Sequence, residues 1–173
     1  MKLNTFFLVS ATAMTMVSGA ANAADEALAD AIWSGVVGGS VPSSNLIITG
    51  ESGGDIQQGT LYVNQDGTFT SSNVVLEARD YNPETQEVGL RQPEATWTYV
   101  TSQVLVGNQV TQEAVLELTD NASSQTFTQG TSGQVTGGYL QLSVTNNTEI
   151  TDVPVEGEAQ VIVQMAASYV EAL

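Results

Sequence analysis

Carboxylates are the charged side chains of this sequence that could do chemistry, because histidine and cysteine are absent and lysine and arginine are scarce. Nineteen Asp and Glu stand against three Lys and Arg, with no His and no Cys. Two acids facing each other across a cleft could hydrolyse a glycosidic bond, but no spacing marks out one pair. The sequence holds no HExxH, calcium loop, nucleophile elbow or Gly-rich phosphate loop. We therefore expect no catalytic residue, no metal ligand and no cofactor, and a protein that is not an enzyme.

The N-terminus has the three-part layout of a secretory signal peptide. Lys2 is followed by an apolar run from Phe6 to Val17 and then by the small-x-small site Ala21-Asn22-Ala23. This apolar run is too short to span a membrane. We expect residues 1–23 to be removed on export and the mature chain to begin at Ala24.

The mature chain would be strongly acidic. Arg79 and Arg91 remain as its cations, and two arginines minus nineteen acids give a formal charge of −17. This charge excludes a basic nucleic-acid surface and attraction to anionic lipid, so we expect no nucleic-acid partner. Copies of the chain would also repel one another beyond contact range. Any assembly must therefore rest on apolar and backbone contacts.

The first stretch of the mature chain reads as a strand with one apolar face. Apolar residues or glycines occupy every odd position of this fifteen-residue run, namely Ala27, Ala29, Ala31, Trp33, Gly35, Val37, Gly39 and Val41. The even positions include Asp30, Ser34 and Ser40, which we expect to face water. A single strand of this length would span about 50 Å. Its small residues make it a poor strand in isolation, so it should need a partner sheet.

The C-terminal stretch from Ala159 to Tyr169 shows the longest regular alternation. Its apolar face consists of Val161, Val163, Met165, Ala167 and Tyr169. We expect this face in the core and a free backbone edge beside it, where another strand could pair. Such an edge is an aggregation hazard unless something covers it. The alternative is an ordinary closing strand of a finished sandwich.

Short strand-like runs fill the region between these two stretches. They are Asn45 to Thr49, Gly59 to Val63, Asn73 to Ala78, Ala95 to Val100, Gln103 to Val106, Ala114 to Leu118 and Tyr139 to Val144. Asp66-Gly67 and Gly107-Asn108 indicate hairpins. The charged stretch from Arg79 to Glu94 reads as a connector or a receptor-binding loop, and Gln129 to Gly138 as a long loop. This spacing predicts an all-β sandwich in one domain, residues 42–173.

A family resemblance rests on three features. The run Ala31-Ile32-Trp33-Ser34-Gly35-Val36-Val37, the alternating end Ala159 to Tyr169 and the absence of cysteine resemble chaperone-usher pilus subunits. The sequence is most similar to the cysteine-free fimbrillins, such as the common pilus major fimbrillin. It departs from the best-known pilins in lacking a disulfide pair and in carrying Ala172 where many have tyrosine.

The resemblance implies an incomplete immunoglobulin-like sandwich that a neighbouring subunit completes. Residues 24–41 would be the donor-strand extension, with Ala29, Ala31, Trp33, Gly35, Val37, Gly39 and Val41 entering the neighbour's groove. The groove-edge strand, which the chaperone would bind, would present Val161, Val163, Met165, Ala167 and Tyr169. Trp33 could instead pack in the core of its own chain.

The partners implied by the resemblance are other copies in a linear polymer, a periplasmic chaperone and an outer-membrane usher, with a glycan or protein receptor as a further candidate. The protein would be exported through the periplasm to the cell surface, as a structural subunit of a fimbria that supports adhesion or biofilm formation. One alternative is a monomeric secreted glycan-binding adhesin, with Trp97 and Tyr99 as a stacking platform for a sugar. A second alternative is a biofilm matrix protein that forms no pilus.

Overall fold

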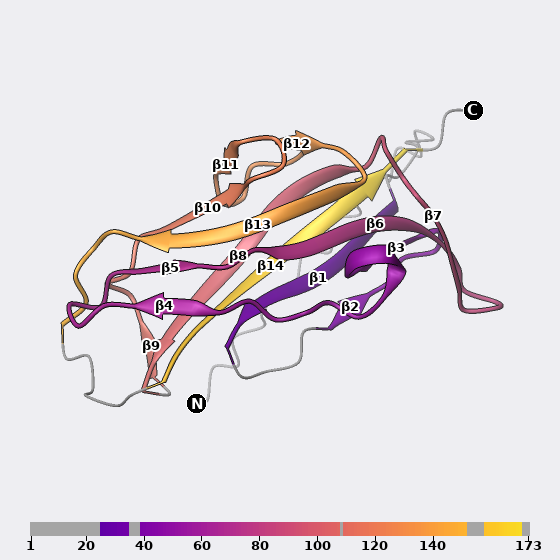
Figure 1. Cartoon of the computed structure of the whole chain (residues 1–173). Helices are drawn as coiled ribbons and strands as arrows, with labels where there is room; N and C mark the ends of the chain where they lie inside the picture. Colours follow the sequence, from indigo (N-terminus) through magenta and orange to yellow (C-terminus); the bar gives the residue numbers. More distant parts are fainter. Residues whose placement is uncertain (1–24, 35–38, 108, 152–157, 171–173) are drawn as a thin grey trace, which may run out of the picture.

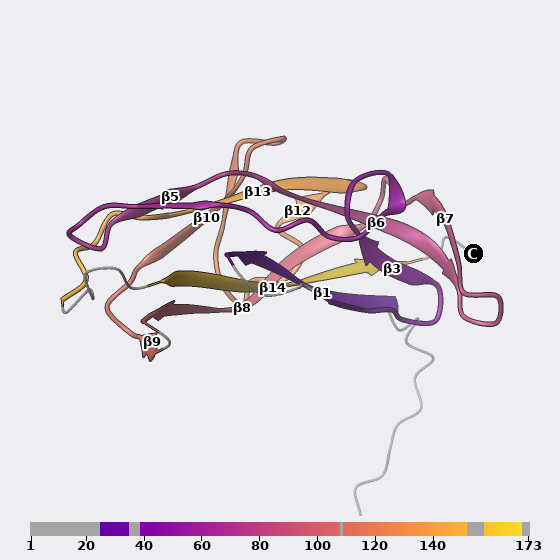
Figure 2. The same cartoon turned by 60° about the horizontal axis from the view of Figure 1, so that its bottom comes forward.

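The computed structural model describes residues 25–34, 39–107, 109–151 and 158–170, and shows two antiparallel β-sheets packed face to face (Figures 1 and 2). Within those ranges there is no α-helix, and the one helical turn is the 3-10 turn η1 (Glu51–Gly53). The prediction of an all-β fold consistent with a sandwich is confirmed. The expected signal peptide, residues 1–23, lies outside the described residues. The described part holds no helix long and apolar enough to cross a membrane.

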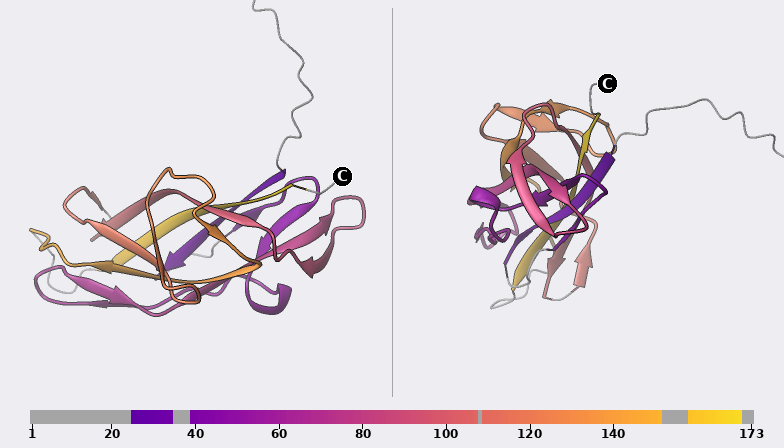
Figure 3. Two further views of the ribbon diagram at one scale, coloured as in Figure 1. Left: turned by 90° about the horizontal axis from the view of Figure 1, so that it is seen from above. Right: turned by 90° about the vertical axis from the view of Figure 1, so that its right-hand side faces the viewer.

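The first sheet contains both ends of the described chain. Its order is β12-β8-β14-β1-β2, and β9 pairs with β8. The strands are β1 (Asp25–Trp33), β2 (Ser40–Val41), β8 (Thr96–Val106), β9 (Gln109–Thr111), β12 (Val135–Thr136) and β14 (Ala159–Tyr169). The N-terminal strand therefore lies directly beside the C-terminal one, as the two views in Figure 3 also show.

The second sheet is centred on β13. β13 pairs with β10 on one side, and with β6 and β5 on the other. At the outside of the sheet, β11 pairs with β10, β4 pairs with β5, and β3 and β7 pair with β6. The strands are β3 (Leu46–Thr49), β4 (Leu61–Val63), β5 (Phe69–Ser71), β6 (Val74–Asn82), β7 (Glu87–Arg91), β10 (Leu116–Asp120), β11 (Gln125–Phe127) and β13 (Tyr139–Asn146).

The core fills the space between the two sheets, because alternate residues of each strand point inward. β13 shows this regularity, with every second side chain from Leu140 to Asn146 buried. The largest fully buried side chains are Trp33, Trp97, Phe69, Leu46, Ile48, Leu76, Leu118, Leu140, Leu142 and Met165. A single hydrophobic cluster therefore joins the first strand, the last strand and the second sheet.

Several strand boundaries differ from the sequence predictions. The two strands expected at Ala95 to Val100 and Gln103 to Val106 form one strand, β8, with an irregularity in its pairing to β14. The stretch from Arg79 to Glu94, expected as a connector or a receptor-binding loop, contains the end of β6, a turn at residues 83–86 and the exposed strand β7, so it is a β-hairpin where no strand was predicted. Strands β4 and β5 do pair across Asp66-Gly67 as expected.

The predicted hairpin at Gly107-Asn108 and the predicted loop from Gln129 to Gly138 both involve short strands that pair with β8. β8 and β9 pair on either side of Gly107-Asn108, although Asn108 itself lies outside the described residues. The long loop expected from Gln129 to Gly138 contains the short strand β12, which pairs with β8. Short pieces of this kind carry too few residues to show a periodicity in the sequence.

Candidate functional site

Strand β1 fills the groove beside β14 in the chain's own fold. The two strands are antiparallel along nine residue pairs, from Asp25 opposite Tyr169 to Trp33 opposite Val161. On its other edge β14 pairs with β8 from Ala159 to Ser168. The backbone edge of β14 that we expected to be free is therefore occupied by β1 of the same chain. The role of β14 as a groove-edge strand for a chaperone or a neighbouring subunit stays a prediction.

The side chains of β1 divide by face. Ala27, Ala29, Ala31 and Trp33 are buried in the core, whereas Glu26 is exposed and Asp30 is half-buried. The three expected donor residues Ala29, Ala31 and Trp33 thus contact the sandwich of their own chain. Their role as donors to a neighbouring subunit stays a prediction.

Trp33 packs in the core of its own chain, the alternative considered above, against neighbours that no sequence pattern indicated. Its indole Nε1 donates a hydrogen bond to the carbonyl oxygen of Ser72, at 2.8 Å. A Cβ atom added to Gly59 would lie only 2.1 Å from Cδ1 of Trp33, so the ring packs directly on the glycine backbone. Gly59 also donates to Ile32 O at 3.0 Å and accepts from the Ser34 N–H at 3.2 Å. The end of β1 is therefore paired on both of its edges, to β14 and to Gly59.

The single fifteen-residue strand predicted from Ala27 to Val41 is not formed. β1 ends at Trp33, Ser34 has a positive φ of 81°, and β2 returns antiparallel to β1. Val41 pairs with Leu28, and paired residues share a face of the sheet, so Val41 points away from the core and is 66% exposed. Its expected inward position was wrong.

In the sequence, the remaining residues of the expected donor strand, Gly35, Val37 and Gly39, come between β1 and β2. Gly39 is exposed, and its carbonyl oxygen accepts a hydrogen bond from the Asp30 N–H at 3.1 Å. Gly35 and Val37 lie outside the described residues.

Strand β14 presents its apolar face to the core as a continuous row. Val161, Val163, Met165 and Ala167 are fully buried, and Tyr169 at the end of the strand is half-buried. This row packs beside the buried face of β1, because directly opposite residues in the two strands share a face. The structure thus brings the two residue sets singled out in the sequence together, within one chain.

Polar contacts hold both ends of β1. The Asp25 carboxylate accepts hydrogen bonds from the backbone N–H groups of Asn45, at 2.6 Å, and Ser44, at 3.2 Å. At the other end, the side-chain amide of Gln160 donates to Ser34 O at 2.9 Å. Charged acceptors on backbone N–H groups make stronger hydrogen bonds than neutral ones. The first turn after β2 therefore helps to fix the start of β1.

The sugar platform considered for Trp97 and Tyr99 is not available. Trp97 is fully buried and donates from Nε1 to Gly137 O at 2.7 Å, while only 4% of Tyr99 is exposed. The Tyr99 hydroxyl donates to Ser102 Oγ, and burial raises the pKa of this phenol more than that hydrogen bond lowers it. Both rings belong to the core, so neither face is open to a stacking ligand.

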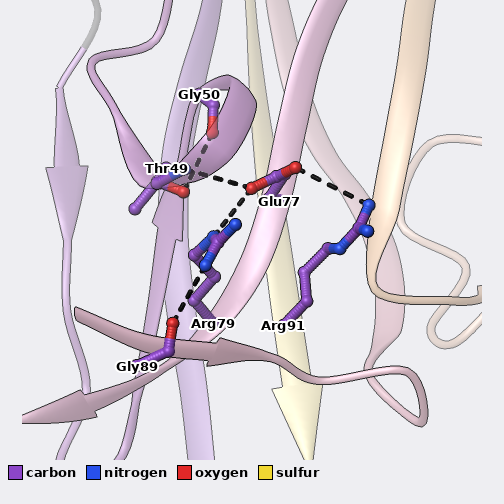
Figure 4. Close-up of polar contacts among 7 residues, drawn as sticks. Thr49, Gly50, Glu77, Arg79, Gly89 and Arg91 are labelled. Atoms are coloured by element: carbon purple, nitrogen blue, oxygen red, sulfur yellow. Dashed lines mark hydrogen bonds and ion pairs between the residues drawn. The ribbon is translucent and has the colours of Figure 1, made fainter.

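Glu77, in the second sheet, forms ion pairs with both arginines of the expected mature chain (Figure 4). Its buried carboxylate accepts from Arg79 Nε at 2.7 Å and lies 3.6 Å from Arg91 Nη1. It also accepts from the Gly53 N–H at 3.2 Å, and Arg79 donates in turn to Gly89 O at 2.9 Å. This cluster ties η1 and β7 to β6, a link that the charged composition of the stretch did not predict.

The surroundings of Glu77 shift its acidity in two opposing directions. Burial raises the pKa of the Glu77 carboxyl. Hydrogen bonds from Arg79 and the backbone, together with the charge of the arginine, lower the pKa by more than burial raises it, so the pKa lies below its ordinary value of 4.5. A carboxyl whose pKa is depressed on folding stabilises the fold above its unfolded pKa. That contribution is lost as the pH falls through the folded pKa.

We expect Glu77→Gln to lower the free energy of unfolding by about 1.5 to 3 kcal/mol at neutral pH, since hydrogen bonds to a charged acceptor are lost. The deficit relative to wild type should shrink as the pH falls below 4.5, because Glu77 of the unfolded wild type then binds a proton, and it should vanish below the lowered pKa of the folded state, where native Glu77 is protonated too. Urea unfolding at several pH values measures both effects. Glu117→Gln, at an exposed position of β10, is the control. A deficit that stays constant down to the lowest pH would contradict the assigned charge interaction.

The carboxylates of the described residues form no group of three or more that could hold a metal ion. Comparison of the chain with protein-family models, with curated proteins and with solved structures finds no match. The candidate site therefore rests on the geometry of β1, β14 and the Trp33 pocket.

Proposed function

We propose that this protein is a structural subunit of a surface fimbria, with an immunoglobulin-like sandwich that polymerises by donor-strand exchange. The chemistry is non-covalent: β1 leaves the groove of its own chain and enters the equivalent groove of a neighbour. A periplasmic chaperone would protect β14 while the groove is open, by adding a strand to its edge. An outer-membrane usher would then guide assembly.

The observation that carries the proposal is the pairing of the first strand with the last one. β1 contributes a buried row, a tryptophan anchor and a nine-pair ladder to β14. In the expected mature chain, which begins at Ala24, β1 is covalently joined to the rest of the sandwich through the segment that follows Trp33. A terminal element with these contacts can be exchanged between identical chains with every contact preserved. The self-paired strand then represents the closed monomer, and the polymer repeats the same contacts between chains.

The free energy that holds β1 of one chain in the groove of the next would come from apolar and backbone contacts. Burying Trp33 contributes on the order of 1.5 to 3 kcal/mol, and each main-chain hydrogen bond contributes about 1 kcal/mol. The acidic charge opposes association, but Debye screening at physiological salt confines it to about 8 Å. Contacts along nine residue pairs outweigh this repulsion.

The absence of cysteine permits a direct test of exchange. Asp30 and Gln164 face each other across β1 and β14, on the outer face of the sheet. We expect Asp30→Cys on one chain and Gln164→Cys on a second chain, differently tagged, to form a disulfide between the chains after assembly, since directly opposite Cα atoms are close enough for one. Non-reducing gels and mass spectrometry of the linked peptide identify the pair.

Two comparisons complete this test. Asp30→Cys mixed with Val110→Cys, on the exposed strand β9, should give no specific linkage, because β9 is not adjacent to β1. Both substitutions on one chain should link within the monomer before assembly. If the two-chain mixture never links under conditions in which the single chain links fully, β1 is an ordinary closing strand and the proposal is wrong.

A further inference from the structure

A hollow of the sandwich lies on the side away from β1. It opens between β8 and β9 of one sheet and β10 and β11 of the other, and has a volume of about 500 Å³. Small-ligand sites commonly measure about 300 to 1,000 Å³. The hollow therefore has the size of a binding site and does not overlap the exchange groove.

The walls of this hollow are polar but carry no charge. None of its lining residues is Asp, Glu, Lys or Arg, in a chain with nineteen acids. Gln103, Gln112 and Gln129 are exposed at its rim, and their side-chain amides make no hydrogen bond to the described residues. Each amide offers both donors and an acceptor. The hydroxyls of Thr111 and Thr128 add further groups of the same kind.

The floor of the hollow is apolar. Leu116, Val104 and the ring of Phe127 line it, and the last two are almost fully buried. The exposed side chains of Val110 and Val115 lie among the lining residues. A pyranose ring needs this combination, because its hydroxyl groups pair with amides and hydroxyls while its C–H face contacts apolar surface.

The charge of the protein narrows the ligand class. A chain with a formal charge of −16 repels anionic ligands, and no carboxylate in the lining would attract a cation. We propose that this hollow binds an uncharged carbohydrate, through the amides of Gln103, Gln112 and Gln129 and the apolar floor. The site would give each copy of the chain an adhesive function in addition to its role in assembly.

The test uses the mature chain and a panel of neutral disaccharides, namely maltose, cellobiose, lactose and mannobiose, with sialyllactose as the anionic comparison. We expect saturation-transfer NMR to show millimolar or tighter binding of at least one neutral sugar and none of sialyllactose. Gln112→Ala combined with Gln129→Ala should weaken that binding at least tenfold. Gln65→Ala, which removes an exposed amide in the β4–β5 turn, should change it less than twofold.

Other outcomes would overturn the proposal. They are binding of no neutral sugar by folded protein, equal binding of sialyllactose, equal weakening by the Gln65 and Gln112/Gln129 variants, or saturation of the hollow by an extended peptide in place of a sugar. The fluorescence of the buried tryptophans reports whether each variant is folded. Because the hollow and the β1 groove are separate, failure here leaves the exchange test unaffected.

Discussion

Replacing Val163 by aspartate is expected to leave no folded protein in the periplasm. Val163 is fully buried in the middle of β14, opposite Ala31 of β1 and Ser102 of β8. An unpaired carboxylate there costs several kcal/mol, out of a typical total stability of about 5 to 15 kcal/mol. The same change places a charge in the middle of the apolar face that the proposed chaperone would bind. Quantifying the exported protein by immunoblot measures the effect.

The neighbouring residue supplies the matched control. Gln164 lies on the outer face of the same strand and is half-buried, so Gln164→Asp adds the same charge without burying it in the core. The new carboxylate faces Asp30 on β1, and this repulsion costs only about 0.2 to 1 kcal/mol. We expect near-normal export of this variant and a melting temperature within a few degrees of wild type. Normal accumulation of Val163→Asp would show that the inner row of β14 is not essential for folding or export.

The second large effect concerns Trp33 and Gly59. Trp33→Ala should lower the free energy of unfolding by about 3 to 5 kcal/mol, because it leaves a cavity and removes the hydrogen bond to Ser72. Gly59→Ala should cost about 1 to 3 kcal/mol by overpacking, since its Cβ would lie 2.1 Å from the indole ring. In the Trp33→Ala background the added methyl has room, so Gly59→Ala should then be nearly neutral.

A double-mutant cycle followed by urea unfolding measures this coupling, which should reach about 1 to 3 kcal/mol between residues in direct contact. Gly39→Ala is the control, because a Cβ at that exposed glycine meets no atom within 4 Å. Additive effects of the two substitutions would mean that the ring does not pack on Gly59. In the proposed polymer the same coupling would act between chains, and it would then appear in the stability of the assembled form.

The sequence alone determined the secondary-structure class and the inward faces of the two terminal strands. Alternation is a local property: in a strand, successive side chains point to opposite faces. The row Val161 to Ala167 could therefore be assigned to the core, and the row Ala27 to Trp33 to a buried face, before any fold was known. Whether that buried face lay in the chain's own core or in a neighbour's groove was left open. The Asp66-Gly67 hairpin was equally local, because the turn residues set the backbone conformation themselves.

The tertiary structure alone decided which strands pair and where β1 ends. Alternation shows which face of a strand is apolar but not which strand lies beside it, so the pairing of β1 with β14 of the same chain could not be read from either stretch. Ser34 looks like a continuing even position, yet β1 ends before it and its φ is positive, and Val41 reaches the surface because β2 pairs with β1 opposite Leu28. The contact of Trp33 with Gly59 likewise depends on the approach of two backbones far apart in sequence, which no local pattern encodes.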